Sequence, residues 1–282
     1  MSSAGSGSLS VTQALHEARS LGVDRLDAQL LLADGLACSR TWLLAHADAE
    51  LDAAQADSLR RRFARRASGE PLAYLLGEKE FHGLMLQVNS SVLVPRPDTE
   101  VLVDWALELL GGALAGVARP KVVDLGTGSG AIALAVKHAH PAATVLATDV
   151  SAAALAVAQA NSRRLALQVE FVEGSWWQAL PQRRFHLALG NPPYIAAGDE
   201  HLVALSHEPA LALTPGGDGL DSLRCIVRGA AAHMEPGAWL LLEHGFDQAD
   251  AVRALLGEHG FADAQTCRDL AGQARCSGAH VQ

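Results

Sequence analysis

The sequence predicts an α/β protein in which a doubly wound, mostly parallel sheet follows a small domain of short helices. Two observations carry this prediction. After Pro120, short apolar strands alternate with helices through short connections, as they do in parallel sheets. Before residue 70, apolar residues recur at helical spacing and no strand pattern occurs. The chain has 282 residues, 49% of them hydrophobic, which is enough to bury a core in each part.

Residues 1–70 are predicted to form a helical bundle. The first ten residues, MSSAGSGSLS, lack the charged and apolar regions of a signal peptide, and we expect a disordered lead-in there. Four or five short helices follow. The first begins at a Ser or Thr cap and ends at Gly22, and the last ends at Gly69, directly before Pro71.

Residues 71–95 are predicted to form a β-hairpin that links the two parts, because FHGLMLQVNSSVLVP alternates and contains an Asn-Ser turn. Residues 96–282 then form the sheet domain, which opens with a helix capped by Asp98 or Thr99. Its strands are expected at 121–126, 144–149, 169–174, 185–190 and 238–245, and its helices at 130–140, 151–165, near 219–235 and at 247–260. Residues 263–281 are expected to close the sheet edge as two weaker antiparallel strands, the last interrupted by Ser277 and Gly278.

Charge and composition exclude several classes of protein. The formal net charge is −9, and residues 81–282 carry 13 Lys and Arg against 20 Asp and Glu, which argues against a general nucleic-acid binder. The four cysteines form no C-x-x-C pair and the twelve histidines no H-E-x-x-H, so we expect neither a metal site nor a disulfide framework. No apolar run of about 18 residues occurs. We therefore expect a cytoplasmic protein that does not enter a membrane.

A glycine-rich loop marks the first candidate binding site. Gly126, Gly128 and Gly130 lie between a buried strand and a helix, where glycines permit a tight turn and a helix N-terminus offers free N–H groups. Asp149 ends the next strand and could bind ribose hydroxyls. This pattern fits a dinucleotide as well as S-adenosyl-L-methionine. Asp124, just before the loop, favours the second ligand, because an acid there would attract its ammonium group and repel a pyrophosphate.

The second candidate site is the tetrapeptide Asn191-Pro192-Pro193-Tyr194, at the end of the fourth predicted strand. Methyl transfer to a planar amine or amide needs acceptors that bind its N–H groups and favour a pyramidal nitrogen. The Asn191 side-chain oxygen and the Pro192 carbonyl could be those acceptors, and the two prolines would hold that carbonyl in place. Tyr194 offers a face for stacking. The tetrapeptide therefore favours a methyltransferase that acts on a planar nitrogen.

With these motifs, the chain resembles the bacterial glutamine N5-methyltransferases of peptide chain release factors (the HemK/PrmC family). The resemblance extends from about residue 71 to 272 through PLAYLLGEKEF, VLVPRPDTEVLVDWAL, VVDLGTGSGAIALA, ALGNPPYI, EPALALTPGGDGLD and DLAG. It implies a Rossmann-like class I methyltransferase sheet, with residues 1–70 as a substrate-recognition domain and residues 96–282 as the methyltransferase domain. It further implies S-adenosyl-L-methionine as cofactor and class I release factors as protein substrates, methylated at the glutamine of their Gly-Gly-Gln motif.

The resemblance also implies roles for individual residues. Asp149 would bind the cofactor's ribose, and Trp176 would lie against its adenine, with Trp177 as the rival for that place. Arg96, Pro97 and Glu100 would border the active site without an acid–base role. The methionine end would be wrapped by Gly126, Thr127, Gly128, Ser129 and Gly130, and the substrate glutamine would be held by Asn191, Pro192, Pro193 and Tyr194. Of these, Asn191, Pro192 and Tyr194 would be catalytic, and Asn191 would also contact the cofactor.

Two other functions fit part of the pattern. A nucleic-acid methyltransferase acting on adenine N6 or guanine N2 would use the same tetrapeptide, but the acidic residues 81–282 disfavour it. A binding module without activity would not need Asn191.

Among smaller features, we expect His244 to be structural, and Glu208 and Pro209 to lie in a loop over the substrate side. The arginines at 60, 61, 62, 65 and 66 suit either a solvated helix end or a contact surface for a release factor.

Overall fold

The computed structural model describes residues 9–282, which form two compact units. The first unit ends at Gly77 and the second is Glu78–Gln282. The division falls beyond the boundary expected at residue 70, because the short helix α5 (Leu72–Leu76) buries Leu75 in the core of the first unit. The hairpin expected as a linker instead buries Phe81 and Leu86 in a core of the second unit, so the chain between the sheet and the bundle is shorter than predicted.

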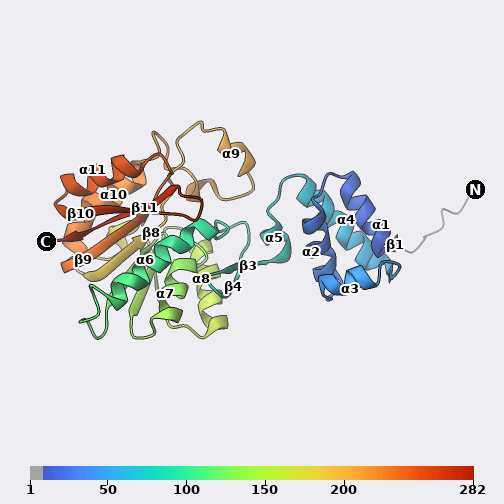
Figure 1. Cartoon of the computed structure of the whole chain (residues 1–282), viewed down its shortest axis with the longest axis horizontal. Coiled ribbons are helices and arrows are strands. Elements are labelled where there is room, and N and C mark those ends of the chain that lie inside the picture. The colour runs from blue at the N-terminus through green and yellow to red at the C-terminus, as the bar shows by residue number, and fades with distance from the viewer. Residues whose placement is uncertain (1–8) are drawn as a thin grey trace, which may run out of the picture. The chain divides into compact units, whose positions relative to one another are not determined.

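The first unit is a helical bundle, as expected. Ser10 and Asp52 each form a capping box with the glutamine three residues further on, which fixes the start of α1 and of α4. Leu31, Leu59 and Phe63 are fully buried between the helices. The helices are α1 (Val11–Ser20), α2 (Arg25–Gly35), α3 (Arg40–Ala45), α4 (Ala53–Ala67) and α5 (Figure 1).

Two short strands that the sequence did not predict close the bundle. β1 (Leu9–Ser10) pairs antiparallel with β2 (Glu50–Leu51), and Leu9 is buried against the core. The end of the expected lead-in is therefore part of the fold, whereas residues 1–8 lie outside the described residues.

Four of the five arginines of α4 are paired with acids of the same unit. The guanidinium of Arg62 also donates to the Leu75 carbonyl at 2.8 Å, which ties α4 to α5. Arg60, Arg62 and Arg66 thus tie α4 to α1 and α2. A contact of this cluster with a release factor stays a prediction. The pairs are Arg60 with Glu17 (2.9 Å), Arg62 with Asp34 (2.5 Å), Arg65 with Glu70 (2.5 Å) and Arg66 with Asp27 (2.6 Å).

The predicted hairpin exists, but its turn is not the Asn-Ser pair. β3 (Glu78–Phe81) and β4 (Leu84–Gln87) are joined by His82 and Gly83, both with positive φ, as a type I′ hairpin turn requires. Asn89 instead makes a separate turn after β4, where its side chain accepts from the Ser91 N–H.

The second unit is built on a seven-stranded sheet in the order β10-β11-β9-β8-β5-β6-β7. The five strands from β9 to β7 run parallel, while β11 and β10 are antiparallel and close one edge, as predicted. The strands are β5 (Lys121–Leu125), β6 (Thr144–Asp149), β7 (Glu170–Glu173), β8 (Phe185–Gly190), β9 (Met234–Glu243), β10 (Phe261–Arg268) and β11 (Ala274–Val281).

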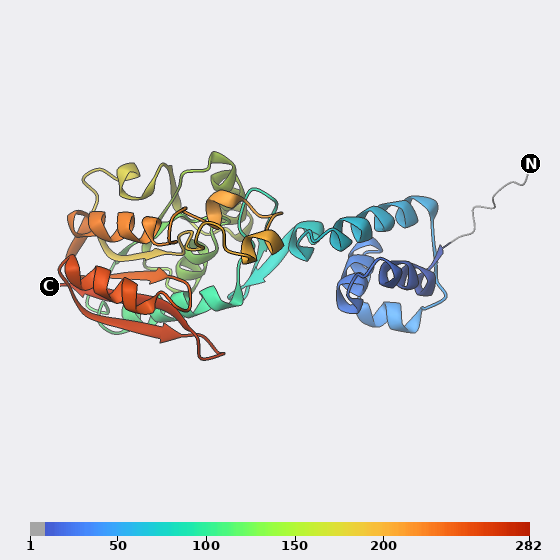
Figure 2. The same ribbon diagram turned by 90° about the horizontal axis from the view of Figure 1, so that it is seen from above.

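Helices cover both faces of this sheet and bury a core on each (Figure 1). Helices α6 (Glu100–Gly111), α7 (Ala131–Ala139) and α8 (Ala152–Leu165) lie on one face. Helices α10 (Asp221–Ala230) and α11 (Ala249–Glu258) lie side by side on the other (Figure 2). Shorter helices occur at α9 (His201–Ala204), Pro97–Thr99, Trp176–Ala179, Ala210–Ala212 and Ala231–His233. Within residues 9–282, no helix has the length and apolar character needed to cross a bilayer.

Gly278 explains why the last strand looked weak in the sequence. A Cβ built there would lie 2.3 Å from Leu241 Cδ2, 2.8 Å from the Leu240 carbonyl oxygen and 2.9 Å from Trp105 Cη2. The glycine that interrupts the strand pattern is therefore what lets β11 fit between β9 and the Trp105 ring of α6.

Candidate active site

A cavity of about 500 Å³ opens at the carboxyl ends of the central parallel strands. Gly126 follows β5, Asp149 ends β6 and Asn191 follows β8, and all three line it. Open α/β sheets bind their ligands at this edge. Both sequence motifs therefore meet in one cavity. The predicted residues that line it are Gly126, Thr127, Gly128, Ser129, Asp149, Trp176, Asn191 and Pro193, whereas Gly130, Pro192 and Tyr194 do not.

Asp149 orients the glycine loop through hydrogen bonds. Gly126, Gly128 and Gly130 have φ angles of 78°, 55° and 86°, which residues with a Cβ rarely adopt. The Gly128 N–H donates to Asp149 Oδ2 and the Ser151 N–H donates to Oδ1, each at 2.9 Å. Burial raises the pKa of Asp149 above its usual value, against the effect of these N–H donors. The carboxylate, predicted to bind the ribose of the cofactor, thus also orients the loop.

Asp124 lies beneath the loop and does not line the cavity. Its Oδ2 accepts from Thr127 Oγ1 at 2.6 Å and from the Ala133 N–H at 3.2 Å, which couples the loop to the first turn of α7. Its Oδ1 is buried and makes no hydrogen bond with a described residue. Burial raises the pKa of Asp124 to about 7.

Only one of the two adjacent tryptophans faces the cavity. Trp176 lines it and covers the loop so closely that a Cβ on Gly126 would lie 3.0 Å from Trp176 Cζ3. Trp177 is buried in the core, where Nε1 donates to the Ile226 carbonyl at 2.7 Å and the ring stacks on His233. Of the two candidates, Trp176 is the one that a ligand in the cavity could touch.

Asn191 is fixed by a residue from a distant part of the chain. Its Nδ2 donates to Thr99 Oγ1, at the start of α6, at 3.2 Å, while Oδ1 makes no hydrogen bond with a described residue. Thr99 also lines the cavity. The amide is thus oriented with its nitrogen on Thr99 and its oxygen available as an acceptor, the role predicted for it.

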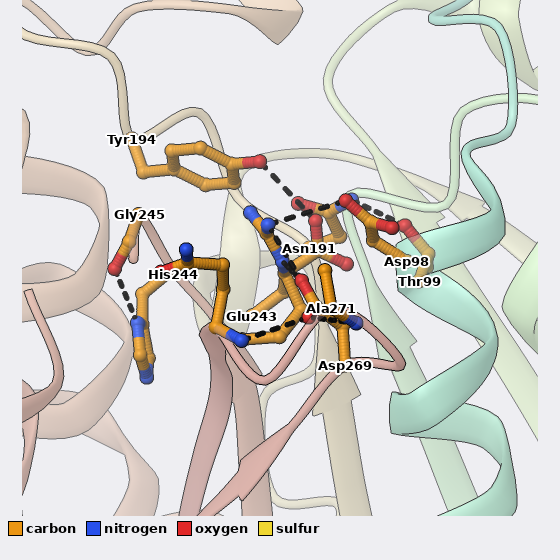
Figure 3. A network of polar contacts seen from close by, with 11 residues as sticks. Asp98, Thr99, Asn191, Tyr194, Glu243, His244, Gly245, Asp269 and Ala271 are labelled. Carbon is orange, nitrogen blue, oxygen red and sulfur yellow. Dashed lines mark hydrogen bonds and ion pairs between the residues drawn. The ribbon is translucent and has the colours of Figure 1, made fainter. Parts of the chain in front are cut away.

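A buried polar network that the sequence did not predict lies behind the tetrapeptide (Figure 3). The Tyr194 hydroxyl donates to Glu243 Oε1 at 3.2 Å. Arg275 forms ion pairs with Asp98 at 3.2 Å and with Asp269 at 2.9 Å. Burial and the nearby Glu243 raise the pKa of Tyr194. Tyr194 does not line the cavity, and the stacking of its ring on the substrate stays a prediction.

Glu208 connects two segments that border the cavity. This buried carboxylate accepts from the Val94 N–H at 3.0 Å and is paired with Arg96. Pro209, the next residue, lines the cavity together with Arg96. The loop expected over the substrate side therefore does border the cavity and is anchored to the chain that follows the hairpin.

His244 lies away from the cavity, as expected of a structural residue. Its Nε2 hydrogen bonds with Ser277 Oγ at 2.8 Å, and burial lowers its pKa. Within residues 9–282, no three His, Cys, Asp or Glu side chains gather as a metal site would require.

Comparisons with known proteins identify the family. Residues 10–77 match the PrmC N-terminal domain, and residues 100–220 match the methyltransferase small domain. A release factor glutamine methyltransferase of Xylella fastidiosa (strain Temecula1 / ATCC 700964) is 49% identical over 246 residues, which cover 86% of this chain and 88% of that protein. The chain belongs to the release factor glutamine methyltransferase family.

Further relatives agree with this assignment. The release factor glutamine methyltransferase of Bordetella pertussis is 48% identical over 92% of this chain and 96% of its own, and that of Yersinia pestis is 43% identical over 82% of each. Membership in this family, with the matched methyltransferase domain, confirms the predictions of a methyltransferase and of S-adenosyl-L-methionine as its cofactor.

Solved structures confirm the class I methyltransferase fold. The T. thermophilus 16S rRNA N2 G1207 methyltransferase (RsmC), in complex with AdoMet and guanosine, is similar with a TM-score of 0.55 and 22% identity, over 73% of this chain and 50% of that one. The hMettl16 catalytic domain is similar with a TM-score of 0.57 and 16% identity, over 78% of this chain and 80% of that one. At these identities the likeness concerns the fold alone.

The residues present fit S-adenosyl-L-methionine. Oδ1 of Asp124 is a buried acceptor beneath the loop without a hydrogen bond to a described residue, and the carboxyl attracts a cationic ligand when it is ionised. Gly128 leaves room for a ligand to approach the backbone, because a Cβ there would meet no atom within 4 Å, and Trp176 provides an aromatic face over Gly126. When bound, the cofactor supplies a sulfonium-activated methyl group. The chain itself supplies the loop, the carboxylate of Asp149 and the acceptor on Asn191.

Proposed function

We propose that the protein transfers a methyl group from S-adenosyl-L-methionine to the side-chain amide nitrogen (N5) of the glutamine in the Gly-Gly-Gln motif of class I peptide chain release factors. The observation that carries this proposal is the oriented Asn191 amide, whose free oxygen shares a cavity with the glycine loop. The names of relatives that are 43–49% identical supply the substrate.

The chemistry of an amide nitrogen explains why this arrangement is needed. Its lone pair is delocalised, so it attacks a methyl carbon poorly unless its N–H groups are bound and its geometry becomes pyramidal. Asn191 Oδ1 would accept from one N–H, and we propose that the Pro192 carbonyl accepts from the other. A protonated N-methyl amide releases its proton readily to water, so the site needs no general base.

An exocyclic amine of a nucleic acid is the second candidate. The tetrapeptide would suit it, because an exocyclic amine is also a planar nitrogen. The charge opposes it, because residues 81–282 carry seven more acidic than basic side chains, and a groove that follows phosphates needs basic ones.

The cytoplasm is the compartment we propose, and the free cysteines at 38, 225, 267 and 276 fit its reducing conditions.

A labelling experiment separates the two substrates. The protein is incubated with methyl-labelled S-adenosyl-L-methionine and, in turn, with a release factor, with the same factor carrying Ala in place of the motif glutamine, and with unmodified rRNA or DNA. We expect label in the first factor only. Label in the Ala-substituted factor would place the reaction at another residue, and label in nucleic acid alone would overturn the proposal.

A further inference from the structure

Gln248 lies outside the cavity, yet its side chain is hydrogen bonded to the tetrapeptide. It is the N-cap residue of α11 and does not line the cavity. Its Nε2 donates to the Tyr194 carbonyl at 3.0 Å, and its Oε1 accepts from the Gly245 N–H at 2.9 Å. These partners settle the orientation of the amide, because a carbonyl can only accept and an N–H can only donate. Glutamine suits this place, since its one side chain supplies both a donor and an acceptor.

The peptide group that follows Tyr194 is bound at both of its polar atoms. Gln248 binds its oxygen, and its N–H, which belongs to Ile195, donates to the Leu213 carbonyl at 3.0 Å. Leu213 belongs to the loop that follows Pro209, whereas Gln248 precedes α11. Two separate segments thus fix the plane of this peptide group, and with it the end of the tetrapeptide.

Gly219 leaves the space that this contact needs. Its φ is 84°, and a Cβ built there would lie 2.3 Å from the Tyr194 carbonyl oxygen, 3.0 Å from Gln248 Nε2 and 3.1 Å from the Ala196 nitrogen. Any side chain at position 219 would therefore displace the carbonyl or its donor. The last glycine of GGDGLD does not line the cavity, and the close approach of the chain to the Tyr194 carbonyl accounts for it.

The two prolines make the far end of the tetrapeptide the place where it can be held. Proline has no N–H, and no backbone N–H of a described residue donates to the carbonyl of Pro192 or Pro193. Both φ angles are fixed, and the second proline restricts the residue before it to extended conformations. The segment is therefore a stiff piece between the Asn191 amide, which is bound to Thr99, and the Tyr194 carbonyl. A shift at its far end would carry the whole piece.

We propose that Gln248 is a positioning residue for methyl transfer, which holds the far end of the tetrapeptide through the Tyr194 carbonyl and so keeps the acceptor groups at its start aligned with the substrate nitrogen. Those groups are Asn191 Oδ1 and the Pro192 carbonyl. This inference rests on the proposed function, because their alignment matters only for a substrate that carries N–H groups. Gln248 acts through the backbone, since a ligand in the cavity would not touch it.

Two substitutions separate the two hydrogen bonds of Gln248. Gln248→Glu keeps the shape and an oxygen that accepts from the Gly245 N–H, but an ionised carboxylate cannot donate to the Tyr194 carbonyl. Gln248→Met has a similar length and makes neither bond. Gln265→Met, at an exposed position on β10, is the matched control. For each variant, kcat and KM for a release factor and the Kd for S-adenosyl-L-methionine are measured, and the urea midpoint shows whether the variant is folded.

We expect both substitutions of Gln248 to lower kcat at least about tenfold, because a misplacement of about 1 Å can cost about 10²-fold. KM and the cofactor Kd should stay within about threefold, as for a group that matters only in the transition state. Gln265→Met should match the wild type. If Gln248 only fastened the start of α11, Gln248→Glu would keep its bond to Gly245 and the wild-type kcat. A kcat of Gln248→Glu within twofold of the wild type would therefore overturn the proposal.

The backbone amide of Ile195 reports the bond to the Tyr194 carbonyl independently of activity, because both belong to one peptide group. Its signal in a ¹⁵N–¹H NMR spectrum should move in Gln248→Glu and in Gln248→Met, and should stay in place in Gln265→Met. An unmoved signal in the Gln248 variants would refute the inference. A wild type that fails to methylate a release factor would refute the proposed function, whereas an active wild type with an equally active Gln248→Glu would refute the positioning role alone.

Discussion

The packing of Trp176 over the glycine loop predicts that alanine destabilises the protein more at Gly126 than at Gly128. Gly126→Ala places a Cβ at a φ of 78°, which costs an L-residue about 1–2 kcal/mol, and 3.0 Å from Trp176 Cζ3, which adds about 1 kcal/mol of overpacking. Gly128→Ala has a φ of 55° and meets no atom within 4 Å, so it carries the backbone cost alone. We therefore expect Gly126→Ala to lower the free energy of unfolding by about 1 kcal/mol more than Gly128→Ala.

Urea unfolding of the protein without cofactor, followed by tryptophan fluorescence, measures this difference directly. The double variant Gly126→Ala with Trp176→Ala should lose the additional cost, because the colliding ring is gone. Equal destabilisation by Gly126→Ala and Gly128→Ala, or no relief in the double variant, would show that Trp176 does not cover the loop.

Three other predictions concern the same unit. Trp176→Ala should weaken S-adenosyl-L-methionine binding about tenfold in calorimetry with little loss of stability, whereas Trp177→Ala should cost about 3–5 kcal/mol of stability; the reverse pattern would assign the adenine contact to Trp177. The pKa of Asp124 is raised from 3.8 to about 7, so the stability it contributes is complete below 3.8 and is lost as the pH rises through 7. Between these values the free energy of unfolding should fall by up to about 1.4 kcal/mol per pH unit, and Asp124→Asn should flatten this slope; equal slopes would contradict the buried carboxylate. Gly278→Ala should destabilise the protein by more than about 2 kcal/mol, because its Cβ would lie 2.8 Å from the rigid Leu240 carbonyl, and an unchanged denaturation midpoint would refute that packing.

The parts of the site that the sequence predicted are those carried by local patterns. A glycine loop between a strand and a helix, an acid at the next strand end, and Asn191 after another strand each occupy one short stretch. Parallel strands bring such stretches to one edge, so their meeting in a single cavity could be foreseen. The resemblance favoured Trp176 over the adjacent Trp177, and the packing shows that Trp176 is the one that lines the cavity. Its contact with adenine stays a prediction.

The parts that the sequence missed depend on contacts between distant segments. Thr99, Glu243 and Arg275 come from the start of α6 and the ends of two strands, and only the sheet register brings them together. An acid at the end of the apolar strand AWLLLE was the available signal for Glu243. We expected the hairpin turn at Asn-Ser, whereas the glycine of His82-Gly83 was the local signal for a two-residue turn. The weak last strand was explained only once Gly278 was seen against its neighbours.

The central claim, that Asn191 orients the substrate amide, is tested most directly by Asn191→Ala. Steady-state methyl transfer to a release factor is measured together with calorimetric binding of S-adenosyl-L-methionine. Loss of one oriented hydrogen-bonding group typically lowers kcat by about 10²–10³, and we expect that loss with the cofactor Kd changed less than about threefold. An unchanged kcat, or a loss of cofactor binding large enough to explain the loss of activity, would contradict the account.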